Sequence, residues 1–193
     1  MSVRIAAWLL AVGLAALATP GCTQGAPNHQ IALYEIASGG VLKVTSPGFA
    51  KGAAIPSADT QAGGNHFPGL AWTGAPGGVR SYVVLVQDSD AFIMRGPVLH
   101  FTLFDIPAGA RSLAAGMTAP PEGSHYGPSY LGAVMAYAGP APPPGPVHHY
   151  HFQVFALDAT LPQDITNGGF TALRAAMTGH VLASGEIVGT FQR

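Results

Sequence analysis

The segment SYVVLVQ, residues 81–87, is apolar and rich in β-branched side chains, as in a strand that is buried on both faces. Glycine and proline, at 26 and 17 residues, interrupt the chain on either side of it. Between these interruptions the same reasoning predicts four further strands, at residues 41–45, 100–105, 150–157 and 186–191.

One helix is indicated near the end of the chain. Phe170, Leu173 and Met177 recur at helical spacing, with Thr166 or Asn167 as a start signal and Gly179 as a stop. Many short strands and few helices predict a mainly β, sandwich-like domain with a small helix near its end.

The first 22 residues have the pattern of a secretory signal peptide. A short start with one positive charge precedes an apolar run over residues 5–17, and small residues and a proline follow. The run is shorter than the roughly 20 residues that span a bilayer. We therefore predict a signal peptide over 1–22, a linker over 23–30 and a single domain over 31–193.

Cys22 is the only cysteine and stands directly after the leader. Its position suggests the lipidated cysteine of a bacterial lipoprotein, which would tether the protein to a membrane. The alternative is ordinary cleavage after Ala18, with Cys22 an incidental free thiol. In both cases the protein is expected to be exported: a periplasmic protein, a membrane-anchored lipoprotein or a secreted protein.

The charge balance argues against a nucleic-acid partner. Eight basic residues face nine acidic ones, for a net charge of −1, and no basic patch is present. Only 9% of residues are charged, and the eight histidines equal lysine and arginine combined. The placement of histidine is therefore the feature to follow.

Asp88 and Asp90 end the most apolar strand, and they point the same way if that strand continues. A solvated turn is the plainer interpretation, since aspartate is common in turns. His100 opens the next strand. Alternation places His148 and Tyr150 on one face of a later strand, with His149 and His151 on the other.

Imidazole N–H groups and a phenol O–H suit an oxyanion such as phosphate. A neighbouring aspartate would repel that anion, but it could fix the tautomer of a histidine by accepting one ring N–H. The same side chains could instead bind a metal ion. That interpretation has no support from spacing, because the chain has no His-Glu-x-x-His motif and no cysteine pair.

Several motifs, in order, resemble the phosphatidylethanolamine-binding protein family, in particular its bacterial Raf-kinase-inhibitor-like branch. The family's Asp-Pro-Asp-Ala-Pro appears as residues 88–92, and its His-Trp as His100-Phe101. Its Gly-Pro-x-Pro-Pro-x-Gly-x-x-His-Arg-Tyr is reproduced over residues 139–150, except that His149 replaces the arginine. The resemblance extends over roughly residues 36–193.

The resemblance implies two antiparallel β-sheets with a few small peripheral helices, and a small pocket for phosphate or phospholipid head groups. By motif position, the ligand-binding residues are Asp88, Asp90, His100, Gly139, Pro140, Pro142, Pro143, His148 and Tyr150. Ser89 and Phe92 replace two prolines of the family pattern, and neither departure removes a presumed pocket residue.

The leading hypothesis is therefore an exported, non-enzymatic protein that binds a small anionic ligand, without a cofactor or a resident metal. A metal-assisted hydrolase that uses the same side chains is one alternative. An inhibitor or adaptor that acts on another protein is a second. The sequence names no protein partner and leaves open whether the chain forms a homodimer.

Overall fold

The computed structural model describes residue 36 and residues 38–93, 96–130 and 136–193. The predicted leader, the linker and Cys22 lie outside these residues. Within them, no helix is both long and apolar enough to cross a membrane.

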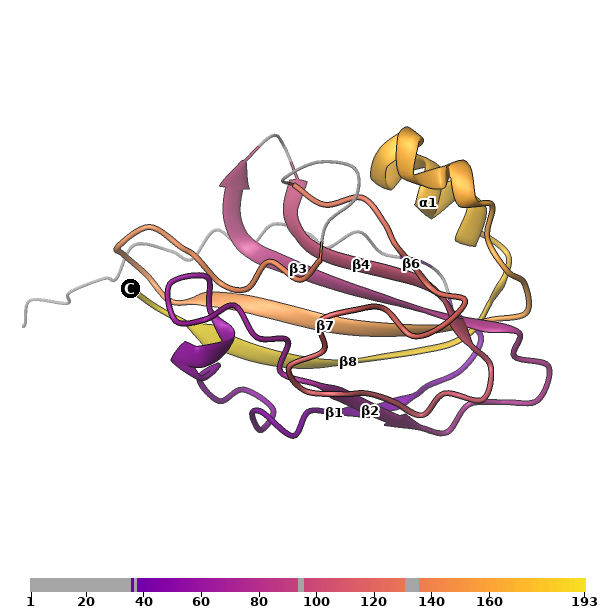
Figure 1. The fold of residues 1–193 in the computed structure, drawn as a ribbon, viewed down its shortest axis with the longest axis horizontal. Coiled ribbons are helices and arrows are strands. Elements are labelled where there is room, and N and C mark those ends of the chain that lie inside the picture. Colours follow the sequence, from indigo (N-terminus) through magenta and orange to yellow (C-terminus); the bar gives the residue numbers. More distant parts are fainter. Residues whose placement is uncertain (1–35, 37, 94–95, 131–135) are drawn as a thin grey trace, which may run out of the picture.

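The strands form two antiparallel sheets (Figure 1). The five-stranded sheet has the order β6-β4-β3-β7-β8 and consists of β3 (Ser81–Ile93), β4 (Gly96–Pro107), β6 (His125–Tyr126), β7 (His148–Leu157) and β8 (Val181–Phe191). The three-stranded sheet has the order β1-β2-β5 and consists of β1 (Lys43–Thr45), β2 (Leu70–Thr73) and β5 (Ser112–Leu113). The helices are η1 (Ser57–Asp59), η2 (Gln163–Gly168) and α1 (Gly169–Met177), of which only α1 is an α-helix.

The predicted fold class is confirmed: the protein is mainly β, with two antiparallel sheets and small peripheral helices. The five predicted strands are present with shifted bounds. The predicted strand 81–87 continues to Ile93, and the last one begins at Val181 rather than at residue 186. β2, β5 and β6 were not predicted as strands, because they have only two to four residues each and so show almost no alternation.

Apolar side chains leave the central sheet on both faces. Trp72, Tyr82 and Phe152 belong to the core between the two sheets. Leu173 and Met177 of α1 pack on the opposite face of the five-stranded sheet. Figure 1 shows this order of layers, with α1 on one side of that sheet and β1 and β2 on the other. Burial on both faces explains why residues 81–87 lack polar alternation.

The pairing of β3 brings the polar candidates to one end of the five-stranded sheet. β3 lies between β4 and β7, and Asp88 of β3 is directly opposite Tyr150 of β7. The register between β3 and β4 shifts between Val86 and Gln87 and again beyond Asp88. Such irregularities re-aim side chains at a sheet rim.

Candidate functional site

Asp88 is the centre of a buried cluster of polar side chains. His148 Nδ1 donates to Asp88 Oδ2 at 2.8 Å, and His100 Nε2 lies 3.9 Å from the same oxygen. The exposed fractions of Asp88, His100 and His148 are 2%, 4% and 5%. The structure thus joins three of the predicted residues, from β3, β4 and β7, around one carboxylate oxygen.

The other oxygen of Asp88 holds the backbone that follows it. Oδ1 accepts the backbone N–H groups of Asp90 at 2.9 Å and Ala91 at 3.1 Å, a local turn typical of aspartate. This turn redirects Asp90, whose Oδ2 accepts the backbone N–H of His149 at 2.7 Å and contacts its Nδ1 at 2.9 Å. The two carboxylates therefore engage different neighbours, Asp88 the ring of His148 and Asp90 the backbone and ring of His149.

The hydrogen-bond partners fix the tautomers of both histidines. The carbonyl oxygen of Ala138 can only accept, so His100 Nδ1, at 2.9 Å from it, carries a proton. His148 Nδ1 likewise donates to Asp88, which leaves Nε2 as its available ring nitrogen. Burial lowers the pKa of His100, against the opposing effect of Asp88, and so favours the neutral ring.

The segment that bears the Ala138 carbonyl is held from its far side by two amide side chains. Asn65 donates from Nδ2 to the Tyr137 carbonyl and accepts the Gly139 N–H at Oδ1, both at 2.7 Å. Gln61 Nε2 donates to the Gly139 carbonyl at 2.9 Å and to the Tyr130 hydroxyl at 2.8 Å. These bonds anchor the start of the proline-rich segment against the loop that contains Asn65 and Gln61.

A pocket of about 80 Å³ opens beside the cluster. Its lining consists of Asp88, Ala91, Val98, His100, Tyr130, Ala141, Pro142, Pro143 and His148. The volume is well below the roughly 300–1,000 Å³ of sites for drug-sized ligands, so the pocket suits a group of a few atoms. Asp88, His100, Pro142, Pro143 and His148 are thus the predicted site residues that line it.

The other four predicted residues do not line the pocket. Gly139 and Pro140 are buried and do not line it, and Asp90 contacts His149. Tyr150 is completely buried, and its ring centroid lies 5.3 Å from that of His100 in an edge-on contact. Its hydroxyl has no hydrogen-bond partner within the described part of the chain, and burial and then Asp88 raise its pKa, so it stays protonated.

Four lining residues were not among the predicted site residues: Ala91, Val98, Tyr130 and Ala141, the last of which lies between predicted Pro140 and Pro142. Tyr130 packs its ring 5.0 Å from that of His100. The presence of tyrosines within the Gly- and Pro-rich stretch 118–147 could have pointed to Tyr130 as a pocket residue. Ala91 and Val98 carry no chemical signal, because small apolar residues are typical of any β-structure.

Polar side chains also gather on the opposite face of the five-stranded sheet. His151 lies between Glu186 Oε2, at 3.2 Å from Nδ1, and Ser89 Oγ, at 3.3 Å from Nε2. Ser89, His151 and Glu186 are arranged in the order of the nucleophile, base and acid of a catalytic triad. Ser89 is only 3% exposed, however, so its hydroxyl is shielded from substrates in solution. His149 and His151 thus lie outside the pocket lining, as alternation predicted.

Known proteins resemble this chain in sequence. The family model described as phosphatidylethanolamine-binding protein matches residues 45–192. The UPF0098 protein of Aquifex aeolicus is 33% identical over 160 residues, which cover 81% of this chain and 92% of that relative. The "Putative lipoprotein LppC" of Mycobacterium tuberculosis is 36% identical over 154 residues, 78% of this chain and 72% of the relative.

Two solved structures share the fold. The crystal structure of YbcL from E. coli, described as a member of the mammalian PEBP family, superposes with a TM-score of 0.72 at 28% identity. CT736 of Chlamydia trachomatis, described as a PEBP homologue, gives 0.70 at 27% identity. Each comparison covers 79% of this chain and 98% of the other.

Proposed function

The chain belongs to the phosphatidylethanolamine-binding protein family, and on that basis we propose that it is a non-enzymatic binding protein for a small oxyanion. The ligand is phosphate, free or as part of a phosphorylated head group, and it occupies the pocket beside Asp88, His100 and His148. The observation that carries the proposal is the shared oxygen of Asp88, which holds His148 at 2.8 Å and faces His100 at 3.9 Å.

The tautomers define what the ligand must supply. With Nδ1 of each ring already donating, a neutral His100 or His148 offers only a lone pair at Nε2, and a protonated ring offers a donor there. The site therefore favours a ligand that shares a proton with an imidazole, as a partly protonated phosphate does. Affinity should weaken as pH rises from about 5 to 8, because both imidazole and phosphate lose protons over this range.

The pocket's size limits how much of a ligand it can enclose. A volume of about 80 Å³ admits a phosphate group but not a lipid, so the rest of a head group would lie outside the lining. The negative charge of Asp88 beside the phosphate would favour a ligand that also carries a cationic group. A phosphate ester that carries an amine is accordingly the head group with the best chemical match.

Calorimetric titration with inorganic phosphate tests the site. His148→Ala should abolish the binding heat while the protein still folds. His180→Ala is the matched control, because His180 pairs with Asp158 at 2.8 Å on an exposed part of the surface. Unchanged phosphate affinity in His148→Ala would remove the assignment, and a flat profile between about pH 5 and 8 would exclude protonated histidine as the donor.

The hydrolase alternative is tested separately. Among the side chains that the structure describes, no group of three or more His, Cys, Asp or Glu is arranged to hold a metal ion. Metal analysis of the purified protein and a panel of phosphoesters would decide the question, since turnover that depends on a bound metal would replace the binding hypothesis.

We also propose that the protein is an exported lipoprotein. The relative whose name includes the word lipoprotein supports this, as does the cysteine that follows the predicted leader. A lipid on Cys22 would place the pocket near a membrane surface, where phosphorylated head groups are abundant. A location outside the cytoplasm disfavours regulation of cytosolic kinases and leaves any protein partner to be found in the export compartment.

A further inference from the structure

Both lysines of this chain, Lys43 and Lys51, line the same groove. The groove has a volume of about 710 Å³ and runs between β1, the segment that follows it, and β8. It shares no lining residue with the 80 Å³ pocket beside Asp88. In a chain with so few charged residues, the presence of both lysines along one groove points to an anionic occupant.

The architecture explains why a groove forms here. β1 and β8 are edge strands of the two different sheets. Just before β1, the Leu42 N–H donates to the Ser184 carbonyl at 2.8 Å and the Ser184 N–H donates to the Gly40 carbonyl at 3.1 Å; after β1, the Gly52 N–H donates to the Val188 carbonyl at 2.7 Å. The close approach requires Gly185, where an added Cβ would lie 2.1 Å from the Leu42 carbonyl oxygen. Beside this contact the edges leave an open space that side chains only partly fill.

The floor of the groove is apolar. Leu42, Val44, Phe49 and Ile187 line it and are 3%, 8%, 6% and 4% exposed, since their other sides belong to the core between the sheets. At one end of the groove lies Val41, a large hydrophobic side chain that is 84% exposed to solvent. Apolar surface at the rim favours an occupant with a hydrocarbon portion.

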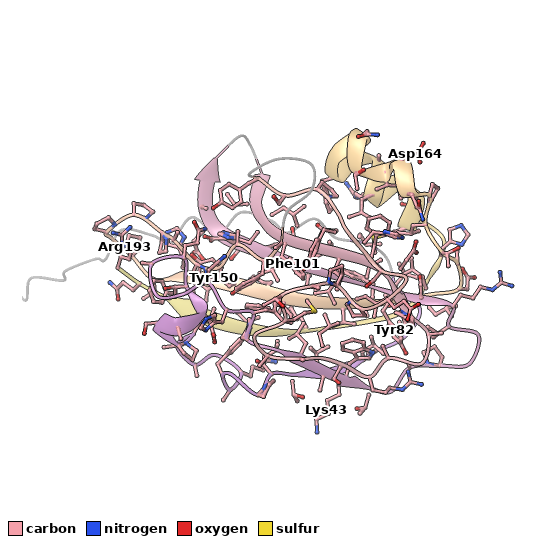
Figure 2. All side chains as sticks on the ribbon, viewed as in Figure 1. Lys43, Tyr82, Phe101, Tyr150, Asp164 and Arg193 are labelled. Carbon is pink, nitrogen blue, oxygen red and sulfur yellow. The ribbon has the colours of Figure 1, made fainter. Side chains whose placement is uncertain are left out.

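The rim of the groove carries net positive charge. Neither lysine forms an ion pair with a carboxylate among the described residues, and Figure 2 shows Lys43 reaching away from the ribbon. Glu186 also lines the groove, but its carboxylate is engaged by His151 and Gln153. The hydrogen bond from His151 is the main cause that lowers the pKa of Glu186, with a small contribution from Lys51.

We propose that this groove binds an anionic amphiphile, with the hydrocarbon chain along the apolar floor and the head group at Lys43 and Lys51. The volume lies within the range of sites for small organic ligands. Long lysine side chains can keep their ammonium groups in water while their stems cover an apolar occupant. This site is independent of the phosphate pocket and does not rest on the function proposed for it.

Monomeric dodecanoate is the probe, compared with dodecyltrimethylammonium and with acetate in the full-length protein. Dodecanoate should bind, and the cationic amphiphile and acetate should bind at least about tenfold more weakly. The double variant Lys43→Glu/Lys51→Glu should weaken dodecanoate binding by a similar factor. Arg174→Glu is the control, because Arg174 is an exposed cation on α1, away from the groove.

A second variant blocks the groove without reversing charge. Ala50 lines the groove and is exposed, so Ala50→Trp should fill the space while the protein folds normally, and dodecanoate binding should be lost. His148→Ala should bind dodecanoate like the wild type. Equal binding of both amphiphiles, or unchanged dodecanoate binding in both groove variants, would overturn the proposal.

Discussion

At the scale of single residues, Asp88 uses both of its carboxylate oxygens. Oδ1 accepts two backbone N–H groups, and Oδ2 accepts the His148 ring. Buried polar groups of this kind need their partners, because a lost partner leaves a donor unsatisfied at a cost of about 1–3 kcal/mol. Asp88 is thus both a structural anchor for the end of β3 and the group that orients His148, whereas His100 is oriented by the Ala138 carbonyl.

The buried imidazole of His100 gives a pH dependence with a definite sign. Its folded-state pKa lies below the ordinary histidine value of 6.5, mainly through burial. The unfolded chain therefore takes up a proton first as pH falls. The stability that the neutral ring contributes is complete above about pH 6.5 and declines as pH falls toward the folded-state pKa, by at most about 1.4 kcal/mol per pH unit.

Replacement of His100 should remove this pH-dependent contribution to the free energy of unfolding. In His100→Gln, the difference in free energy of unfolding from wild type should narrow between pH 7 and pH 5, as measured by denaturant titration at each pH. A difference that stays constant over this range would show that His100 titrates alike in the folded and unfolded chains.

At the scale of elements, the proline-rich segment depends on close packing at its start. An added Cβ at Gly139 would lie 2.2 Å from the Asp59 carbonyl oxygen, so Gly139→Ala must displace the wall or the η1 loop. We expect a loss of about 1–3 kcal/mol in the free energy of unfolding and weaker phosphate binding. Gly109→Ala, where nothing lies within 4 Å of the added atom, is the control. Equal effects of the two substitutions would contradict the packing argument.

Prediction from sequence succeeded where an element has a long pattern. β3 and β7 have 13 and 10 residues, and their burial follows directly from runs of apolar and alternating side chains. The site was predicted where a residue type carries chemistry, as at His100 and His148. Asp90 does not line the pocket but contacts His149, and strand alternation alone could not indicate this, because it depends on specific hydrogen bonds of the two aspartates. The roles of Asn65 and Gln61 depend on contacts 72 to 78 residues away in sequence, which no local pattern reveals.

At the scale of the whole molecule, the processing of the N-terminus determines where the pocket operates. We expect the mature protein from its native host to begin at Cys22 with an attached lipid, as intact-mass and N-terminal peptide mass spectrometry would show. Cys22→Ser should release the protein from the membrane fraction. A mature N-terminus directly after Ala18, with an unmodified thiol at Cys22, would contradict the lipoprotein assignment and leave a secreted or periplasmic protein.

The molecule as a whole combines a small polar pocket at one end of the five-stranded sheet with a larger groove between its two sheets. Both depend on a particular edge or end of the same β-structure, and neither shares a lining residue with the other. A variant of one site should therefore weaken binding of the ligand of that site and leave binding at the other site unchanged.

The most direct test of the central claim is long-range ¹H–¹⁵N NMR of the histidine rings during a titration with inorganic phosphate at about pH 6. The account predicts that Nε2 of His148 shifts most and that His100 follows, while His180 on the surface stays unchanged. Phosphate-induced shifts confined to other histidines, or no shift at His148 at saturating phosphate, would contradict it.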